Sequence, residues 1–314
     1  MQYYFAPMEG LTDHIFREIH HRYFPGIHRY YTPFLSPTVH RKLTPKEARE
    51  IPPADSMPYK LIPQLLTKNP EDFLWMANQC ADLGYDEINL NLGCPSGTVT
   101  AKGKGSGMLR DTDALDAFLY TVCKTSPIPV SVKTRIGFES PGEFPALMEI
   151  YNRYPIRELT VHPRVRSAFY NGSVDHSAFA DAVKTAKMPL CFNGNICSLR
   201  QANAIADRYP GVDAVMIGRG LIGDPGMMTP GGTTAAGIFA FTTELMEAYT
   251  EAYGSARNAM FRMKENWRYL HRRFDGSEKL YKKLRKTTDL TQYKELTQQI
   301  VETLPLADGL RCDW

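Results

Sequence analysis

The feature that most constrains the fold of this chain is the regular alternation of short apolar runs with helix-like segments. Eight runs rich in apolar and β-branched residues are expected strands: residues 3–6, 28–32, 61–65, 87–91, 130–134, 158–161, 190–192 and 214–217. Helix-like segments lie between most of them, at residues 13–23, 71–83, 112–124, 142–154, 177–185 and 198–208. Strands that are apolar along their whole length are typical of parallel sheets covered on both faces. The order therefore predicts a (β/α)8 TIM barrel, an α/β fold.

A doubly wound open sheet is the alternative that shares this alternation. In that fold the turn after the first strand carries the glycine pattern GxGxxG, which holds a dinucleotide. Here the first strand runs instead into Pro7-Met8-Glu9-Gly10. The barrel is therefore the favoured fold.

The chain changes character after residues 224–237, a stretch rich in Gly, Pro and Thr that is typical of a linker. Only helix-like segments follow, at residues 239–253, 256–273, 277–286 and 290–303. In the second of these, Met260, Met263, Trp267 and Leu270 recur at helical spacing, which predicts a buried stripe. We therefore expect a catalytic TIM-barrel domain at residues 1–237 and a small all-α helical bundle at residues 238–314.

Positive charge is concentrated in this helical part. Residues 257–286 contain eleven Lys and Arg but three acidic residues, so the segment carries a formal charge of +8 while the whole chain carries +3. Lys264, Arg268 and Arg272 are spaced to share one helix face. A concentrated basic face indicates a polyanion such as RNA as the partner. The alternative is an ordinary solvated face, since exposed helices are often rich in Lys and Arg.

Several classes of protein are not supported by the sequence. None of the six cysteines stands at the spacing of a zinc site or a CxxC redox pair, so we expect neither a metal nor structural disulfides. The chain starts without the basic and apolar regions of a signal peptide, and it has no run of about 18 apolar residues for a membrane span. We expect a cytoplasmic protein, and a monomer because no additional hydrophobic seam is evident.

Polar residues stand at the carboxyl end of nearly every predicted strand, and in a TIM barrel these ends build the active site. Lys133 closes an apolar strand, where a cation is costly unless it is paired with an anion, either a bound cofactor or a barrel carboxylate. Asn193-Gly194-Asn195 and Gly218-Arg219 combine glycines with a guanidinium and suggest a phosphate site, although two ordinary glycine turns would look alike.

Cys94 lies in a Gly-Cys-Pro turn, directly before a glycine-rich loop that we expect to move over a substrate. A thiol in this place can donate a proton or act as a nucleophile. No spacing of a Cys-His hydrolase is present, so the acid role is favoured. The alternative is an inert buried cysteine.

Together these elements resemble the tRNA-dihydrouridine synthase family. The resemblance covers nearly the whole chain and rests on APMEG (6–10), NLNLGCPSG (89–97), VSVKTRIG (130–137), VHPR (161–164), FNGNI (192–196), AVMIGRG (214–220) and RMKENWRYLHRRF (262–274). It implies FMN-dependent reduction of uridine to 5,6-dihydrouridine in tRNA, with NADPH as the reductant and a C-terminal helical RNA-binding domain.

The resemblance also implies a role for each matching residue. Cys94 is the general acid, which protonates carbon 5 of a flipped-out uracil while a hydride from reduced FMN reaches carbon 6. The implied cofactor-binding residues are Pro7, Met8, Glu9, Gln64, Lys133, His162, Asn193, Gly194, Asn195, Gly218 and Arg219. The implied substrate-binding residues are Asn91, Arg135, Arg164, Lys264, Arg268 and Arg272. Pro163 and the lysine-rich segment KGKGSGMLRD (102–111) depart from the family pattern and leave the loop geometry open.

Two other functions share parts of this pattern. An FMN barrel reductase for a small-molecule pyrimidine would need the same phosphate site, but it does not account for the basic tail. A catalytically silent RNA-binding protein on a flavin-barrel scaffold would explain the tail, but it leaves Cys94 and Lys133 without a purpose. An rRNA target is an alternative to tRNA.

Overall fold

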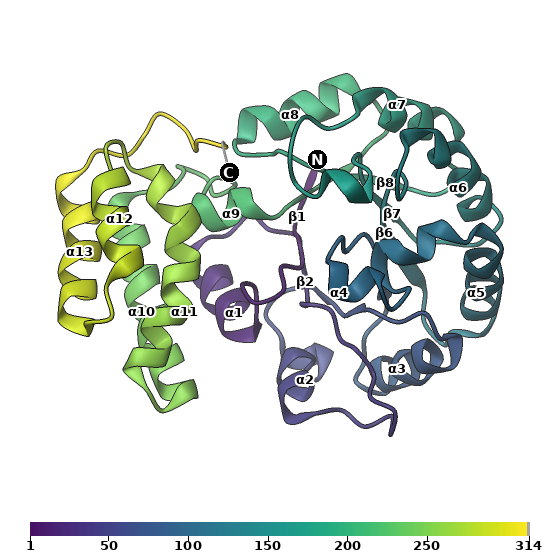
Figure 1. The fold of residues 1–314 in the computed structure, drawn as a ribbon, viewed down its shortest axis with the longest axis horizontal. Helices are drawn as coiled ribbons and strands as arrows, with labels where there is room; N and C mark the ends of the chain where they lie inside the picture. Colours follow the sequence, from purple (N-terminus) through teal and green to yellow (C-terminus); the bar gives the residue numbers. More distant parts are fainter. Residues whose placement is uncertain (313–314) are drawn as a thin grey trace. The chain divides into compact units, whose positions relative to one another are not determined.

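The computed structural model describes residues 1–312, and its central element is a sheet of parallel strands (Figure 1). The strands are hydrogen-bonded in the order β3-β2-β1-β9-β8-β7-β6-β5-β4. Their bounds are β1 (Gln2–Phe5), β2 (Arg29–Tyr31), β3 (Leu61–Ile62), β4 (Gln64–Leu65), β5 (Ile88–Leu92), β6 (Val130–Arg135), β7 (Leu159–His162), β8 (Leu190–Asn193) and β9 (Ala214–Ile217). Every predicted strand is present, within two residues of its expected ends.

The two edges of this sheet, β3 and β4, are consecutive in the chain and are separated only by Pro63. Proline has no N–H to donate, so it interrupts the ladder within one continuous strand. The Ile62 carbonyl accepts from the N–H of Thr32 at 3.1 Å on one side, and the Pro63 carbonyl accepts from the N–H of Asn89 at 2.8 Å on the other. β3 and β4 therefore count as two halves of one barrel strand, which gives eight strands in total. The predicted (β/α)8 barrel is confirmed.

The helices of the barrel part follow its strands, and α5, α6 and α7 lie outside β6, β7 and β8 (Figure 1). Their bounds are α1 (His14–Tyr23), α2 (Pro45–Glu50), α3 (Pro70–Asp82), α4 (Gly97–Thr100), α5 (Thr112–Thr125), α6 (Phe144–Tyr151), α7 (His176–Thr185), α8 (Leu199–Arg208) and α9 (Arg219–Gly223). The N-caps of α3 and α5, Asn69 and Asp111, both accept hydrogen bonds from the first turn of their helices. Helices α2, α4 and α9 were not expected, because each is too short for its periodicity to be recognised.

Apolar side chains from neighbouring strands fill the barrel. One buried cluster joins side chains of five strands: Tyr4, Ala6, Tyr31, Ile62, Cys191, Ala214 and Met216. Cys191 is therefore a packing residue, and burial raises its pKa well above the ordinary value. A core of this kind leaves chemistry to the two ends of the barrel.

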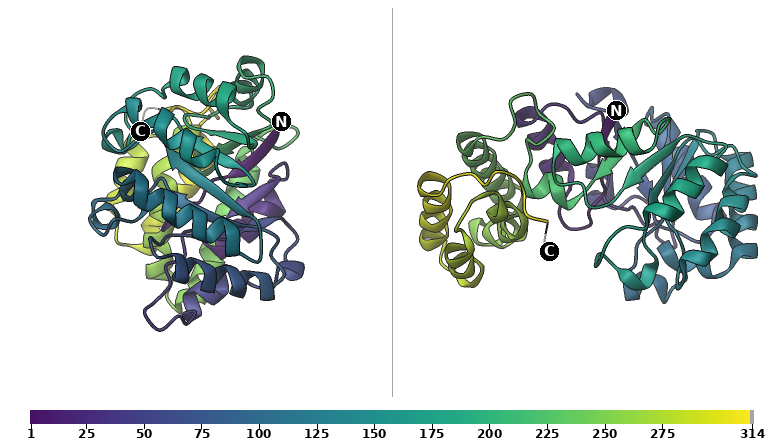
Figure 2. Two further views of the ribbon diagram at one scale, coloured as in Figure 1. Left: turned by 90° about the vertical axis from the view of Figure 1, so that its right-hand side faces the viewer. Right: turned by 90° about the horizontal axis from the view of Figure 1, so that it is seen from above.

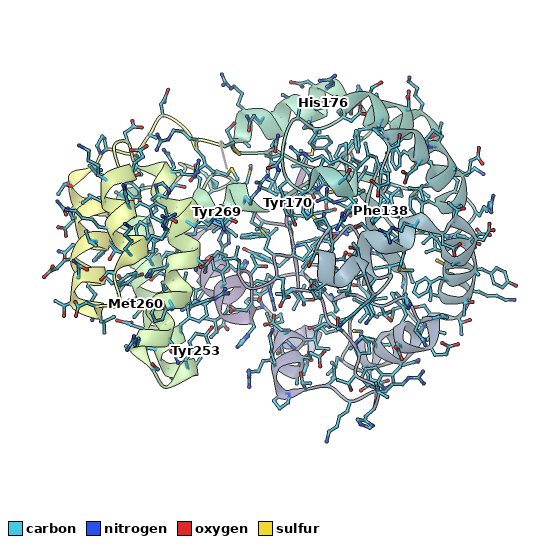
Figure 3. All side chains as sticks on the ribbon, viewed as in Figure 1. Phe138, Tyr170, His176, Tyr253, Met260 and Tyr269 are labelled. Carbon is cyan, nitrogen blue, oxygen red and sulfur yellow. A yellow bond between two sulfur atoms is a disulfide. The ribbon has the colours of Figure 1, made fainter. Side chains whose placement is uncertain are left out.

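The remaining helices are α10 (Ala235–Tyr253), α11 (Ala256–Leu270), α12 (Glu278–Lys286) and α13 (Leu290–Thr303), drawn green to yellow in Figure 2. The predicted stripe on α11 is buried, including Met260, which Figure 3 labels. The stretch at 224–237 is not a free linker, because Met227 and Met228 are buried and Asp224 forms an ion pair with Arg273 at 3.2 Å.

By compactness the chain divides into two units. The first contains residues 1–7, 28–194 and 203–216, and the second contains residues 8–27, 195–202 and 217–314. Helix α1 belongs to the second unit. The rings of Phe16 and Phe241 pack edge-to-face with their centres 5.6 Å apart, and a carboxylate oxygen of Asp13 lies 2.8 Å from a guanidinium nitrogen of Arg262. The functional division at residue 237 stays a prediction, since compactness does not assign a role.

The second unit also contains a disulfide between Cys197 and Cys312, whose Cα atoms are 6.5 Å apart. The expectation of no structural disulfide is therefore wrong. The two cysteines are 115 residues apart in sequence, and such a separation gives no recognisable spacing. Within residues 1–312, no three His, Cys, Asp or Glu side chains are grouped to hold a metal ion, and no helix has the length and apolar composition to cross a membrane.

Candidate active site at the carboxyl ends of the barrel strands

A chain of buried side-chain hydrogen bonds crosses three neighbouring strands inside the barrel. Asn91 donates to Gln64 at 2.8 Å, Gln64 donates to Asn89 at 2.8 Å, and Asn89 donates to Ser131 at 2.9 Å. Strand register explains the chain, because Gln64 pairs with Asn89 and Asn89 pairs with Ser131. Asn89 and Ser131 were not predicted as site residues, although two asparagines separated by one apolar residue in a strand must share a face.

The turn that carries Cys94 is fixed on both sides. The Asn91 side-chain oxygen accepts from the backbone N–H groups of Gly93 at 3.1 Å and Cys94 at 2.9 Å. The Cys94 carbonyl accepts from the N–H of Ser106 at 3.2 Å and from its hydroxyl at 2.8 Å. The thiol-bearing residue is therefore held in one backbone conformation, as a positioned proton donor requires.

Two glycines after Cys94 are places of close packing, and the expected motion of this loop stays a prediction. A Cβ on Gly105 would lie 3.0 Å from both the Cβ and the carbonyl oxygen of Cys94, and Gly105 has a φ of +59°. A Cβ on Gly107 would lie 2.9 Å from the Thr100 carbonyl oxygen. Residues Gly105–Leu109 are all buried within a short 3-10 helix.

Lys133 lies on β6 and donates to the Asn193 side-chain oxygen at 2.7 Å. Asn193 in turn donates to the Met216 carbonyl at 2.7 Å, which fixes the orientation of its amide. Burial, together with the positive charge of Arg135, lowers the pKa of Lys133 to about 7. In the part of the chain that the structure describes, no carboxylate forms an ion pair with Lys133. This cation therefore lacks the anionic partner that burial demands.

Arg135, two residues further along β6, clamps two loops. It donates to the Gly93 carbonyl at 2.8 Å and to the Val165 carbonyl at 2.9 Å. Its guanidinium also lies 5.4 Å from the ring centre of Tyr170, a residue that the sequence analysis did not single out. Arg135 thus joins the Cys94 turn to the loop that follows β7.

Arg164 is buried and holds this same loop. It donates to the carbonyls of Asn171, at 3.1 Å, and Gly172, and it contacts the His162 ring nitrogen at 2.8 Å. Gly194 follows β8, where a Cβ would lie 2.6 Å from Val174 and 3.4 Å from His162. Arg164 therefore shapes the loop, a structural role that was not expected.

Other predicted cofactor residues belong to the second unit. Met8 begins a turn in which its carbonyl accepts from the N–H groups of Leu11 and Thr12. Asn195 has a φ of +49°, and Gly218 is the N-cap of α9. A side chain on Gly220 would overlap the Ile196 carbonyl, so the loop after β8 is pressed against α9. Glu9 is exposed, and Pro7, which belongs to the first unit, is half-buried.

The predicted basic face divides into bound and exposed cations. Lys264 donates to the Thr287 carbonyl at 2.7 Å, so one of its three ammonium N–H groups is used within the protein. Arg268 is exposed, and together with Arg272 and Arg285 it partly offsets the rise that burial causes in the pKa of Tyr281. Five further cations are exposed on the amphipathic helix α12, and none of them was predicted individually as an RNA contact. They are Lys279, Lys282, Lys283, Arg285 and Lys286.

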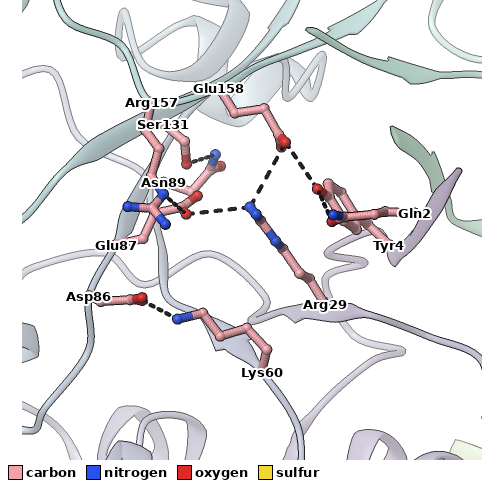
Figure 4. A network of polar contacts seen from close by, with 10 residues as sticks. All are labelled: Gln2, Tyr4, Arg29, Lys60, Asp86, Glu87, Asn89, Ser131, Arg157 and Glu158. Atoms are coloured by element: carbon pink, nitrogen blue, oxygen red, sulfur yellow. Dashed lines mark hydrogen bonds and ion pairs between the residues drawn. The ribbon is translucent and has the colours of Figure 1, made fainter. Parts of the chain in front are cut away.

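The opposite, amino ends of the strands hold a different cluster (Figure 4). Buried Glu87 pairs with Arg157 at 2.9 Å and with Arg29 at 3.4 Å, and Glu158 lies 3.9 Å from Arg29 and accepts from the Tyr4 hydroxyl at 3.0 Å. A cavity of about 190 Å³ lies beside Tyr4, Arg29, Arg157 and Glu158. In TIM barrels this end serves stability rather than catalysis.

The fold and the strand-end site together define a (β/α)8-barrel enzyme with a cysteine in a fixed turn and a half-buried ammonium at the carboxyl ends of its strands. The fold is similar to that of a solved morphinone reductase mutant in complex with tetrahydroNAD, with a TM-score of 0.52 and 11% identity over 72% of this chain and 85% of that chain. At this identity the likeness concerns the fold alone.

The family follows from the sequence comparisons. The model of the family described as "Dihydrouridine synthase (Dus)" matches residues 4–309, so the chain belongs to the dihydrouridine synthase family. A Synechocystis sp. protein named "Probable tRNA-dihydrouridine synthase 1" is 28% identical over 96% of this chain and 86% of its own length. The tRNA-dihydrouridine synthase B of Proteus vulgaris is 31% identical over 70% of this chain and 67% of its own length.

Proposed function

We propose that this protein reduces uridine in tRNA to 5,6-dihydrouridine, with FMN as cofactor and NADPH as reductant. Membership of the dihydrouridine synthase family and the names of the relatives support the reaction class. The structural observation that carries the proposal is Lys133, a half-buried cation in the barrel mouth whose described side-chain hydrogen bond goes to the neutral Asn193.

The residues around Lys133 suit a flavin. A reduced flavin carries negative charge on its pyrimidine ring and would supply the anion that Lys133 lacks. The Gln64 side-chain oxygen accepts from Asn91 and its amide donates to Asn89, so Gln64 keeps one amide N–H that it can offer the ring. We assign the ring to Gln64, Lys133 and His162. The other cofactor contacts are assigned to Pro7, Met8, Glu9, Asn193, Gly194, Asn195, Gly218 and Arg219.

A bound FMN would supply the hydride, and the protein would supply the proton and the orientation. Cys94 is the proton donor, because Asn91, Arg135 and Ser106 fix the main chain around it. Asn91 also keeps a second amide hydrogen that can meet a uracil carbonyl. Arg135 stabilises negative charge that develops on the base, as a fixed donor in a desolvated site.

RNA would be held by the exposed cations of the helical region, for which we propose residues 238–314 as the RNA-binding domain and residues 1–237 as the catalytic domain. Arg268, Arg272 and the five exposed cations of α12 are the proposed phosphate contacts. Such contacts grip the backbone without reading its sequence. Lys264 and Arg164 contribute to substrate binding by holding the carbonyls of Thr287, Asn171 and Gly172 in place.

The decisive test is to measure dihydrouridine by mass spectrometry in tRNA from a strain that lacks this protein. Wild type should restore a missing dihydrouridine, whereas Cys94→Ala should not. Cys123→Ala is the matched control, since Cys123 is a half-buried free cysteine on α5. Unchanged tRNA in the deletion strain, with no second synthase present, would overturn the tRNA assignment. If the purified protein showed no flavin absorption spectrum, the assignment of FMN as its cofactor would be wrong.

A further inference from the structure

Four side chains from the three loops after β5, β6 and β7 form an alternating stack of arginines and phenylalanines. The Arg110 guanidinium carbon lies 3.8 Å from the ring centre of Phe138. The Arg166 guanidinium carbon lies 5.2 Å from the Phe138 ring centre and 5.1 Å from that of Phe169. Phe138, labelled in Figure 3, is buried, whereas Phe169 is 40% exposed. The stack therefore runs from exposed Arg110 through the buried ring of Phe138 and ends at the partly exposed ring of Phe169.

The backbone at this last ring is strained. Phe169 has a φ of +49° and a ψ of −106°, a region that glycine adopts readily and phenylalanine does not. Its N–H donates to the Arg166 carbonyl at 3.0 Å, and the next turn is held by the N–H of Asn171, which donates to the Ala168 carbonyl at 2.9 Å. A strained backbone conformation persists only where contacts with the surrounding structure impose it, and such conformations are frequent at functional sites.

The stack is also tied to the catalytic turn. The Arg166 side chain donates to the Thr100 hydroxyl at 3.4 Å on α4, the helix that begins three residues after Cys94. Arg135 bridges the Gly93 carbonyl and the Val165 carbonyl, which stands immediately before Arg166. Phe169 is therefore fixed with respect to the proton donor, although it does not belong to the proposed uracil site.

We propose that Phe169 is a stacking platform for a nucleobase next to the target uridine, an inference that rests on the proposed function. An aromatic ring backed by a cation favours a flat π-system on its open face, and every base offers one. Two arginines in the stack favour a polyanionic chain over an apolar protein segment. A platform of this kind stabilises the neighbour of a base that has left its stack.

The experiment compares Phe169→Ala, Phe169→Gly and Phe169→Tyr in affinity for unmodified in vitro transcribed tRNA, over a series of salt concentrations, and in kcat/KM for dihydrouridine formation. Tyr120→Ala is the matched control, because Tyr120 is 55% exposed and lies beside the cation of Lys124. Thermal melting and flavin content show whether each variant folds. Phe169→Gly is the important variant, because glycine relieves the backbone strain while it removes the ring.

The Ala and Gly variants should lose about 5- to 150-fold in affinity or in kcat/KM, the range for one base stacked on an aromatic side chain. Phe169→Tyr should stay near wild type, the salt dependence of binding should be unchanged because no charge is removed, and Phe169→Gly should melt no lower than wild type. Wild-type affinity and kcat/KM in Phe169→Gly, or equal losses in the Tyr and Ala variants, would overturn the platform. Absence of dihydrouridine formation by wild type would instead overturn the proposed function.

Discussion

Glu158 gives the clearest quantitative prediction, because its carboxyl is buried at the amino end of the barrel and burial raises its pKa to about 7 from 4.5. The nearest cation, Arg29 at 3.9 Å, acts in the opposite direction but does not offset burial. The folded state therefore prefers the protonated carboxyl. The stability linked to Glu158 is complete below pH 4.5, falls as the pH rises through 7, and is constant above that. A difference of 2.5 pH units corresponds to about 3 kcal/mol.

Glu158→Gln tests this value, because the amide stays neutral and can still accept a hydrogen bond from the Tyr4 hydroxyl. Urea unfolding should show the variant about 3 kcal/mol more stable than wild type at pH 8.5, with a difference below about 1 kcal/mol at pH 5. Glu278→Gln is the control, since Glu278 also pairs with an arginine but is exposed. A difference that does not depend on pH, or a variant less stable at pH 8.5, would refute the reasoning and show that the Arg29 ion pair outweighs burial.

Three further predictions concern the site and its partners. Lys133 loses its charge above pH 7, whereas negative charge on a reduced flavin would favour the charged form. The reduction potential of the bound flavin should therefore fall more steeply between pH 7 and pH 9 in wild type than in Lys133→Met, and equal slopes would contradict this. Gly105→Ala should lower kcat more than tenfold, because its methyl group would lie 3.0 Å from the carbonyl oxygen of Cys94, the proposed proton donor. Gly97→Ala, with open space around it, should not lower kcat, and equal rates in the two variants would argue against a fixed turn. Removing both Lys282 and Lys283 should make the plot of log affinity for tRNA against log salt shallower by about 2, and an unchanged slope would place the RNA elsewhere.

Periodicity was sufficient to predict the eight strands of the barrel, because hydrophobic pattern and strand length are local properties of the chain. It could not predict that Pro63 divides the third strand, since the interruption depends on which neighbour each half pairs with. The packed stretch at 224–237 was misread for a related reason. Its Gly and Pro content indicates a turn-rich segment, but the ion pair between Asp224 and Arg273 is a tertiary contact.

In the candidate site, too, the sequence predicts where a residue lies along a strand but not which residues its side chain contacts. Strand-end location was enough to select Cys94 and Lys133, because parallel topology brings carboxyl ends together. Whether a cation is exposed or occupied depends on contacts that residue spacing does not record. Lys264 shares a helix face with Arg268, yet Lys264 caps a carbonyl while Arg268 faces solvent.

The amide chain in the barrel limits the chemistry that its mouth can support. Two backbone N–H groups point at one side-chain atom of Asn91, so that atom must be the oxygen, and the orientations of the Gln64 and Asn89 amides follow from it. Lys133 can present only N–H groups to a ligand, and Gln64 keeps one amide N–H that the chain of hydrogen bonds does not use. Ligands rich in carbonyl and ring-nitrogen acceptors suit these donors. Flavin and uracil both carry such acceptors, so the polarity of these side chains supports the proposed function.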